Sequence, residues 1–382
     1  SRFAIGEGRV HYRNRYVRTR EYLEEEAAGR MLYRAFGTNR PGGLISNLMR
    51  MRFKNAANTS VVWHGGRLLA LWEAGQPHAL DPETLATLGR HDFDGALSNR
   101  FPERLLFPEL PFSAHPRRDP DTGTLYNFGL AFGAQHRLML YELSTDGELA
   151  EPDWIPLDEL SFMHDFALTP NWRVFLETPV RFRIAQMLGG LTTPAASLKR
   201  RAGRPMRALL ISRHDGHVRR ICAPQGQGQG FVFHLANGFE DGDDRIIVDG
   251  FRMQRMPPTE VWRAMIEGEP TDYPAPQLMR YTIDLAEEQM HERPLHTLRG
   301  EFPVTHPARH GRPYRHVWGT AVPPGRGLPT MTALARWDTE QPGKTRLHDL
   351  FPDLPGEPIF APRSASEDDG WLLSMVYRVA SH

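Results

Sequence analysis

Short strand patterns closed by glycine turns recur along this chain, and they constrain its fold more than any other feature. In the clearest example, residues 61–64 (VVWH) and 67–72 (RLLALW) flank Gly65-Gly66. Two glycines between two runs of apolar, β-branched and aromatic residues predict a hairpin with a two-residue turn. Further strand patterns occur at 138–143, 208–212, 231–234, 245–248 and 371–379. We therefore predict the all-β fold class.

Helical patterns are few. One covers residues 19–36, with glutamates near its start, and a shorter one covers residues 258–266. Many short strands, 34 glycines and 32 prolines, without alternation of helices and strands, favour a β-propeller or large barrel over a parallel α/β sheet. Such folds form one domain at this length of 382 residues. We expect a single domain over residues 1–382 with no separate second domain.

Charge and cysteine content exclude several classes of partner and site. The 46 basic and 46 acidic residues cancel, so no net field attracts nucleic acid. The single cysteine, Cys222, cannot form an intramolecular disulfide, which fits a reducing cytoplasm and excludes a thiolate-rich metal site. No apolar run reaches the roughly eighteen residues of a membrane span. We expect a cytoplasmic protein that is soluble or, at most, peripheral at a membrane.

The segment Phe182–Arg207 differs from the rest of the chain. It mixes apolar residues with Gly189-Gly190 and ends in a basic cluster between Lys199 and Arg204. An apolar loop beside basic residues is able to dock on an anionic membrane surface. An ordinary surface loop that covers the core is the simpler interpretation of the same pattern.

Three histidines lie at the edges of strand patterns: His115, His164 and His234. Their separations are 164 − 115 = 49 and 234 − 164 = 70 residues, comparable with or somewhat longer than one propeller blade of about 40–50 residues. Successive blades would direct them to one axis. Imidazoles bind iron, copper, nickel or zinc. This pattern alone is weak, because a histidine between aromatic residues is more often a hydrogen-bonded core residue.

Three glutamates are candidates for holding such ligands in place. A metal-bound histidine usually donates its other ring N–H to a carboxylate or carbonyl. Glu73 follows an apolar strand pattern and Glu301 precedes Phe302, so each is a charge that needs a buried partner. Glu367 lies in a run of acidic residues, where a solvated turn is an equal alternative.

Five further histidines are expected at the surface. They occur in polar or turn-rich stretches, where a histidine is more often exposed than a ligand. They are His64, His78, His306, His310 and His316.

Seven motifs, in one order and spread over nearly the whole chain, resemble those of the carotenoid cleavage oxygenases. They are NTSVVW (58–63), LALWEAG (69–75), AHP (114–116), HDFALT (164–169), FHLAN (233–237), EFP (301–303) and EDDGWLL (367–373). Within that family, LWEAGQPH (71–78) and GEPIF (356–360) are most similar to bacterial apocarotenoid-15,15'-oxygenases, which yield retinal.

The resemblance implies a seven-bladed β-propeller with a small helical dome over an axial Fe(II) held by four histidines. His115, His164 and His234 match three of these ligands. The fourth is expected beyond the end of this chain, and His382 does not match it. Both ends of the chain are expected to be truncated relative to the family, so an isolated fragment would be incomplete.

The same resemblance gives each glutamate a role. Glu73 would orient His164, Glu301 would orient His234, and Glu367 would orient the fourth histidine. In that scheme no side chain acts as acid or base, so we expect no catalytic residue beyond the metal ligands.

The implied reaction is oxidative cleavage of a C=C double bond of an apolar polyene, a carotenoid or apocarotenoid, with O2, to give aldehydes such as retinal. Phenylpropanoid-cleaving members place a lysine where this chain has Trp72. Loss of that cation removes a partner for a phenolate and favours an apolar substrate. Stilbene or phenylpropanoid cleavage is the alternative, and a catalytically silent propeller that binds a ligand is another. Tight binding of one iron per chain would separate an oxygenase from the silent protein.

Overall fold

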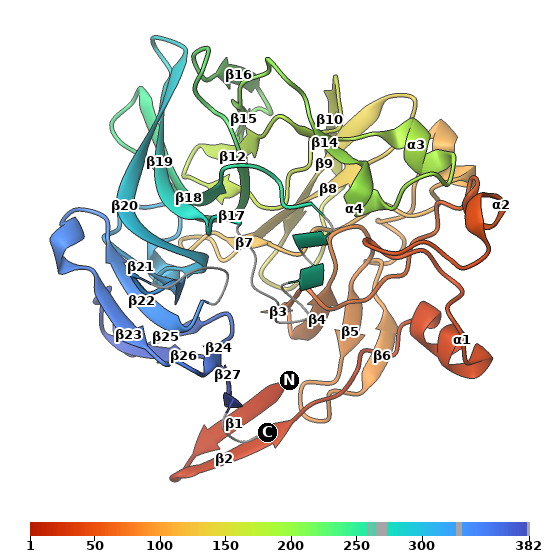
Figure 1. Ribbon diagram of the computed structural model, residues 1–382, viewed down its shortest axis with the longest axis horizontal. Coiled ribbons are helices and arrows are strands. Elements are labelled where there is room, and N and C mark those ends of the chain that lie inside the picture. Colours follow the sequence, from red (N-terminus) through yellow and green to blue (C-terminus); the bar gives the residue numbers. More distant parts are fainter. Residues whose placement is uncertain (259, 262, 265–272, 326–330, 380–382) are drawn as a thin grey trace. The chain divides into compact units, whose positions relative to one another are not determined.

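Antiparallel strands are the main regular secondary structure of the computed structural model, which describes residues 1–258, 260–261, 263–264, 273–325 and 331–379 (Figure 1). The chain divides into two compact units. Unit 1 comprises Ser1–Leu160 and Phe182–Leu198, and unit 2 comprises Ser161–Arg181 and Lys199–His382. The predicted all-β class is confirmed, whereas the single domain over residues 1–382 stays a prediction.

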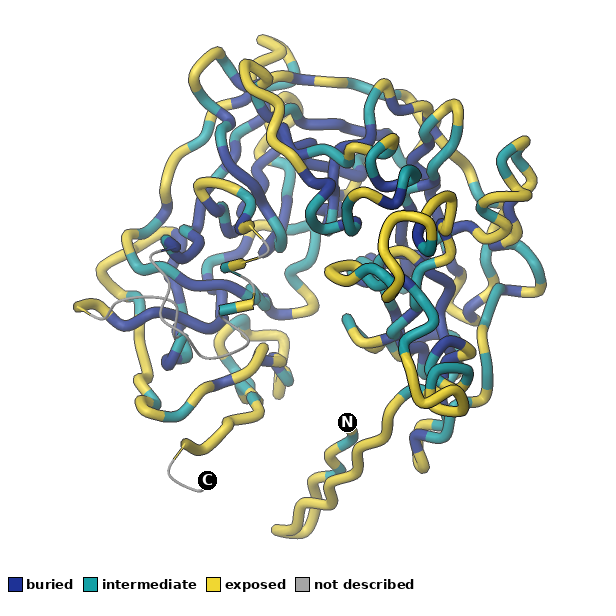
Figure 2. The backbone as a smooth tube through the Cα atoms, turned by 45° about the vertical axis from the view of Figure 1, so that its right-hand side comes forward, coloured by how far each residue is buried: buried dark blue, intermediate teal, exposed yellow. Residues whose placement is uncertain are grey.

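Unit 1 contains two four-stranded antiparallel sheets whose strands follow one another in sequence order. The first consists of β3 (Ser60–His64), β4 (Arg67–Leu71), β5 (His78–Leu80) and β6 (Thr87–Arg90). The second consists of β7 (Arg117–Arg118), β8 (Leu125–Ala131), β9 (His136–Leu143) and β10 (Asp153–Leu157). A separate hairpin, β1 (Arg2–Gly6) and β2 (Arg9–Arg13), is exposed along most of its length (Figure 2).

The predicted hairpin at Gly65-Gly66 is present between β3 and β4. Both glycines have positive φ values, 53° and 71°, as a two-residue hairpin turn with both central residues left-handed requires. A Cβ on Gly65 would come within 2.4 Å of the Gly147 Cα, so only glycine fits there. Trp72 lies one residue beyond β4 and not within the strand as predicted.

The helices of unit 1 are short. They are α1 (Arg20–Ala28), α2 (Gly43–Asn47), the 3-10 turn η1 (Pro102–Leu105), α3 (Ile184–Leu188) and α4 (Pro194–Ser197). The helix expected over 19–36 does begin after Thr19, whose Oγ1 accepts a hydrogen bond from the Tyr22 N–H. It ends at Ala28, because Gly29 turns into the left-handed region and its N–H bonds the Glu26 carbonyl. Of the second predicted helix, 258–266, residues 259, 262, 265 and 266 lie outside the described residues.

Unit 2 contains a four-stranded sheet and a seven-stranded sheet. The smaller one consists of β11 (Ala167–Leu168), β12 (Trp172–Glu177), β15 (Arg207–Ser212) and β16 (Val218–Cys222). The larger one runs through β17 (Phe231–Glu240), β18 (Arg245–Met253), β19 (Gln277–Asp284), β20 (Gln289–Val304), β21 (His316–Ala321), β22 (Ala333–Asp338) and β23 (Arg346–Asp349). The first part of β20 pairs with β19 and its last part pairs with β21.

Shorter elements complete unit 2. They are η2 (Pro307–Arg309), η3 (Pro342–Lys344), and the strand pairs β24 (Leu354–Pro355) with β27 (Val376–Tyr377) and β25 (Ile359–Pro362) with β26 (Gly370–Leu373). The chain passes between the units within β13 (Val180–Phe182) and β14 (Leu198–Arg200). Each unit has its own apolar core between its sheets. Consecutive four-stranded meanders of this kind are typical of propeller blades.

The surface positions predicted for the extra histidines are wrong for four of the five. His64, His78, His306 and His316 are buried, and His310 is half-buried. Hydrogen bonds accommodate two of these polar rings. The His64 Nε2 lies 2.6 Å from the Ser144 carbonyl oxygen, and His306 bridges the Ala308 N–H and the Ser364 carbonyl. Polar flanking sequence did not reveal these long-range partners.

Candidate metal centre

His164 and His234, two of the predicted ligands, lie side by side in unit 2. His164 precedes β11 and His234 is in β17. Their ring centroids are 5.1 Å apart and the ring planes are inclined by 71°. Both side chains are half-buried. Tertiary structure thus brings together two histidines that are 70 residues apart in the sequence.

A buried carboxylate, Asp165, holds the two histidine segments together. Its Oδ1 accepts a hydrogen bond from the Phe166 N–H at 2.8 Å, and its Oδ2 accepts one from the Leu235 N–H at 2.9 Å. Asp165 directly follows His164, and Leu235 directly follows His234. One side chain therefore ties the His164 segment to the His234 segment. Sequence analysis missed this role, although an acid within the apolar HDFAL stretch was a usable signal.

Glu301 is in direct contact with His234. The Nδ1 of His234 lies 2.8 Å from Oε2 of Glu301, and Glu301 is buried. The same carboxylate oxygen accepts the backbone N–H of Phe302. The sequence had paired these two residues, and the contact is present. That it serves to orient a metal ligand stays a prediction.

The backbone around Glu301 departs from regular strand geometry. The register between β20 and β21 shifts between Glu301 and Val304, and Phe302 has a φ of 58°. A bulge of this kind redirects a side chain at the end of a strand. Gly319 opposite permits the distortion, because a Cβ there would lie 2.6 Å from the Glu301 carbonyl oxygen. The strained segment aims the Glu301 carboxylate at β17.

Burial and nearby carboxylates act in opposite directions on His234. Burial lowers the pKa of the ring, but the charge and hydrogen bond of Glu301, with smaller contributions from Asp165 and Glu357, raise it to about 9. The ring is therefore strongly polarised by its acidic neighbours.

Glu357 belongs to the same electrostatic cluster, although sequence analysis did not select it. Burial raises the pKa of its carboxyl group, His234 and His164 oppose this, and Glu301 adds to it. Glu357 lies in the GEPIF motif noted for its resemblance to the family. That motif was the available signal.

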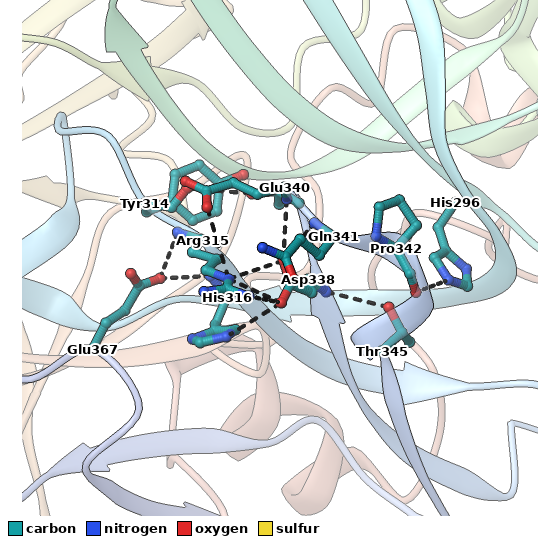
Figure 3. A network of polar contacts seen from close by, with 11 residues as sticks. His296, Tyr314, Arg315, His316, Asp338, Glu340, Gln341, Pro342, Thr345 and Glu367 are labelled. Atoms are coloured by element: carbon teal, nitrogen blue, oxygen red, sulfur yellow. Dashed lines mark hydrogen bonds and ion pairs between the residues drawn. The ribbon is translucent and has the colours of Figure 1, made fainter.

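Glu367 has different neighbours. Its Oε1 accepts the backbone N–H groups of Arg315 at 2.8 Å and His316 at 2.6 Å (Figure 3). Arg315 in turn forms an ion pair with Asp338 at 2.8 Å. Glu367 therefore anchors the start of β21. Its predicted role beside a fourth histidine stays a prediction.

His115 and Glu73 belong to unit 1. The Oε1 of Glu73 accepts a hydrogen bond from the Ser113 Oγ at 3.3 Å, and Asn127 donates to the Ser113 carbonyl at 2.8 Å. Ser113 lies two residues before His115, so this network fixes the segment that bears the half-buried His115. The predicted action of Glu73 on His164 stays a prediction.

Aromatic side chains pack around the histidine pair of unit 2. Phe233 meets the His164 ring edge-on at 5.1 Å, and Phe302 lies 5.5 Å from the His234 ring. Phe162 packs against Phe233 in turn. The surroundings are thus apolar apart from the carboxylates, which strengthens electrostatic interactions.

The donor set fits a transition metal. His234 donates its Nδ1–H to Glu301, which selects the tautomer whose Nε2 lone pair binds a metal ion. Imidazole nitrogens without thiolate ligands suit iron, copper, nickel or zinc. The geometry alone does not choose among these metals.

Comparison with known proteins identifies the family. A family model described as retinal pigment epithelial membrane protein matches residues 1–382, and so spans both units. The apocarotenoid-15,15'-oxygenase of Synechocystis sp. is 36% identical over 387 residues, covering 99% of this chain and 76% of that protein. This chain belongs to the carotenoid cleavage oxygenase family. The resveratrol cleavage oxygenase 1 of Aspergillus fumigatus, another relative of this oxygenase, is 30% identical, with coverage of 99% and 76%.

Solved structures agree with the family assignment. Cobalt-substituted Synechocystis apocarotenoid oxygenase superposes with a TM-score of 0.88 and 36% identity, covering 100% of this chain and 78% of that one. The oxygenase described here therefore has the β-propeller fold of that family, and its predicted class, a carotenoid cleavage dioxygenase, is confirmed. The seven blades and the helical dome stay predictions. Cobalt substitution in the relative shows that the family binds a metal.

Proposed function

We propose that this oxygenase cleaves one C=C double bond of an apocarotenoid with O2 and releases aldehydes such as retinal. The observation that supports this most is the His164–His234 pair, with His234 bonded to Glu301 at 2.8 Å among aromatic side chains. The similarity to an enzyme named apocarotenoid-15,15'-oxygenase supports the choice of substrate.

The proposed cofactor is Fe(2+), with His115, His164 and His234 as ligands. The rings of His164 and His234 lie 5.1 Å apart, centre to centre, in unit 2, and the family resemblance adds His115 to them. Bound iron supplies the redox chemistry that activates dioxygen.

The protein side chains bind and orient and do not transfer protons in this proposal. Glu301 accepts the Nδ1–H of His234, which keeps Nε2 directed at the metal position. Phe233 and Phe302 offer apolar faces to a polyene and exclude water. We assign Glu357 to the carboxylates around this site because its charge is coupled to His234 and His164, whereas Glu367 is bonded to backbone amides.

Cleavage of stilbenes or phenylpropanoids is the second candidate. Relatives named resveratrol cleavage oxygenase 1 and, in Pseudomonas putida, isoeugenol monooxygenase support it, the latter at 28% identity. Trp72 argues against it, because this position holds an indole where phenylpropanoid-cleaving members place a lysine, and an indole offers no cation to a phenolate.

The segment Phe182–Arg207 is proposed as a peripheral membrane contact. None of the helices in the described part of the chain is both long and apolar enough to span a membrane. Leu191 is 65% exposed and the basic residues from Lys199 to Arg204 are exposed, whereas Met187 and Leu198 are buried. We expect sedimentation with phosphatidylglycerol vesicles, weakened by Leu191→Asp. Equal sedimentation of both proteins would leave the segment as an ordinary surface loop.

The decisive experiment uses the full-length protein loaded anaerobically with Fe(II). Iron content is measured, an apocarotenal is added in air, and loss of polyene absorbance and aldehyde products are followed. Iron near one per chain and a retinal-length aldehyde containing oxygen from labelled O2 are expected. Iron with an intact polyene and a cleaved stilbene would support the second candidate. Absence of iron binding would leave a protein with structural histidines.

A further inference from the structure

A cavity of about 260 Å³ lies within unit 1 beside Glu73. Trp72, Ala74 and Gly75, the residues that flank Glu73, line it. Met51, Phe53, Leu106, Phe107, Leu130 and Phe132 supply apolar walls. Pockets that enclose a whole drug-sized ligand measure roughly 300–1,000 Å³. This cavity is therefore sized for one end of a long molecule.

Charged side chains line the same cavity. Arg20, Arg52 and Glu109 are exposed, whereas Glu21 is only 7% exposed. The exposed charges therefore lie where the cavity meets solvent, whereas Met51 of the apolar lining is only 6% exposed. Such a lining is amphipathic, so it fits a ligand with an apolar chain and a polar group at its end.

Arg52 is held in one orientation at this rim. Its Nη2 donates to Oε1 of Glu21 at 2.8 Å, and its guanidinium carbon lies 5.3 Å from the centre of the Tyr33 ring. Glu21, the partner of Arg52, lies in the first turn of α1, so its backbone is fixed by the helix. Within the described residues, Nε and Nη1 of Arg52 donate to no protein acceptor. These N–H groups remain for a ligand oxygen.

We propose that Arg52 binds the carbonyl-bearing end of the polyene substrate, and that the apolar walls of the cavity pack against the adjoining chain. The proposal rests on the proposed function and adds a specificity-determining residue to it. A hydrogen bond from a guanidinium to a carbonyl oxygen is charge-assisted and stronger than a neutral one. An all-hydrocarbon end would desolvate the guanidinium without giving it an acceptor. The cavity therefore discriminates between an apocarotenal and a hydrocarbon polyene of the same length.

Arg18 provides a matched control. Its Nη2 lies 3.0 Å from Oε2 of Glu26, also on α1, and its guanidinium carbon lies 5.8 Å from the Tyr22 ring centre. Arg18 is not among the residues that line the cavity. Each arginine thus has its own glutamate partner on α1 and its own tyrosine neighbour, but only Arg52 lines the cavity.

The test compares an apocarotenal with a polyene of equal length in which a methyl group replaces the aldehyde. Binding to the full-length protein is followed by quenching of tryptophan fluorescence, and kcat/KM is measured with the iron-loaded enzyme. Arg52→Met should weaken aldehyde binding by roughly 10- to 100-fold and hydrocarbon binding by less than about threefold. Arg52→Lys, which keeps a cation, should retain part of the preference, and Arg18→Met should retain all of it.

The outcomes separate this proposal from the proposed function. Equal weakening of both probes by Arg52→Met, in a protein with unchanged circular dichroism, would overturn the role of Arg52 while cleavage by the wild type still stands. If the wild type cleaves neither probe, the proposed function fails, and the fluorescence comparison still decides whether Arg52 recognises the aldehyde. An equal preference for the aldehyde in Arg52→Met and in the wild type would also overturn the role of Arg52.

Discussion

Four histidines of unit 1 and His234 of unit 2 are withdrawn from solvent, yet their pKa values shift in opposite directions. In unit 1, burial is the largest effect on each of four rings, and it lowers their pKa values; they are His64, His78, His91 and His136. In unit 2, burial acts on His234 in the same direction, but Glu301 raises its pKa to about 9. Burial alone thus makes a neutral packing residue. A carboxylate at hydrogen-bond distance makes a polarised ring suited to a metal.

The largest expected effect comes from removing a proposed metal ligand. His164→Ala in the full-length protein removes one of the paired imidazoles, so we expect loss of tightly bound iron and of polyene cleavage. His64→Ala, in unit 1, should lower the melting temperature but retain iron. Metal analysis and the absorbance assay measure both. Loss of iron from a folded His64→Ala protein would show that a buried histidine of unit 1 also contributes to iron binding.

The second test replaces each of three glutamates by the uncharged glutamine. Glu301→Gln and Glu357→Gln should each lower iron affinity by roughly 10- to 100-fold, because the groups around the ligands lose their charge. Glu367→Gln should retain iron, since the glutamine carbonyl still accepts the Arg315 and His316 N–H groups. Iron titration gives the three affinities. If Glu367→Gln weakens binding as much as Glu301→Gln, then Glu367 orients a ligand as the sequence suggested.

The third test concerns the spacing of the histidine pair. Asp165→Ala leaves the Phe166 and Leu235 N–H groups without their acceptor, at about 1–3 kcal/mol each in the free energy of unfolding. Asp165→Asn keeps one acceptor oxygen and should lose about half as much. Chemical denaturation measures the difference. A fully stable Asp165→Ala protein would mean that packing alone sets the distance between His164 and His234.

The smallest expected effect is a pH dependence in unit 1. A histidine whose folded pKa lies below its unfolded value binds fewer protons when folded, so stability falls as pH drops below about 6.5 toward the folded pKa. Burial lowers the pKa of His78 in this way. His78→Leu should therefore flatten the change in melting temperature between pH 7.5 and 5.5. A slope equal to that of the wild type would remove His78 from this explanation.

Much of the fold was accessible from the sequence because it depends on near neighbours. Gly65-Gly66 between two apolar runs predicts its hairpin, since few other residues adopt two successive positive φ values. The helix after Thr19 has its predicted cap, yet its length depended on one left-handed residue, Gly29. The motifs around His115, His164 and His234 were enough to identify the family.

Tertiary structure alone decided which polar groups meet. His234 and Glu301 are 67 residues apart, Leu235 and Asp165 are 70 apart, and Glu367 reaches the backbone of Arg315 across 52 residues. Local periodicity reports which face a side chain occupies, but not its partner on a distant strand. The burial of His306 and the coupling of Glu357 to the histidine pair follow from strand register and from the bulge at Glu301. The sequence thus determined the strands and the candidate ligands, whereas long-range pairing determined their electrostatic surroundings.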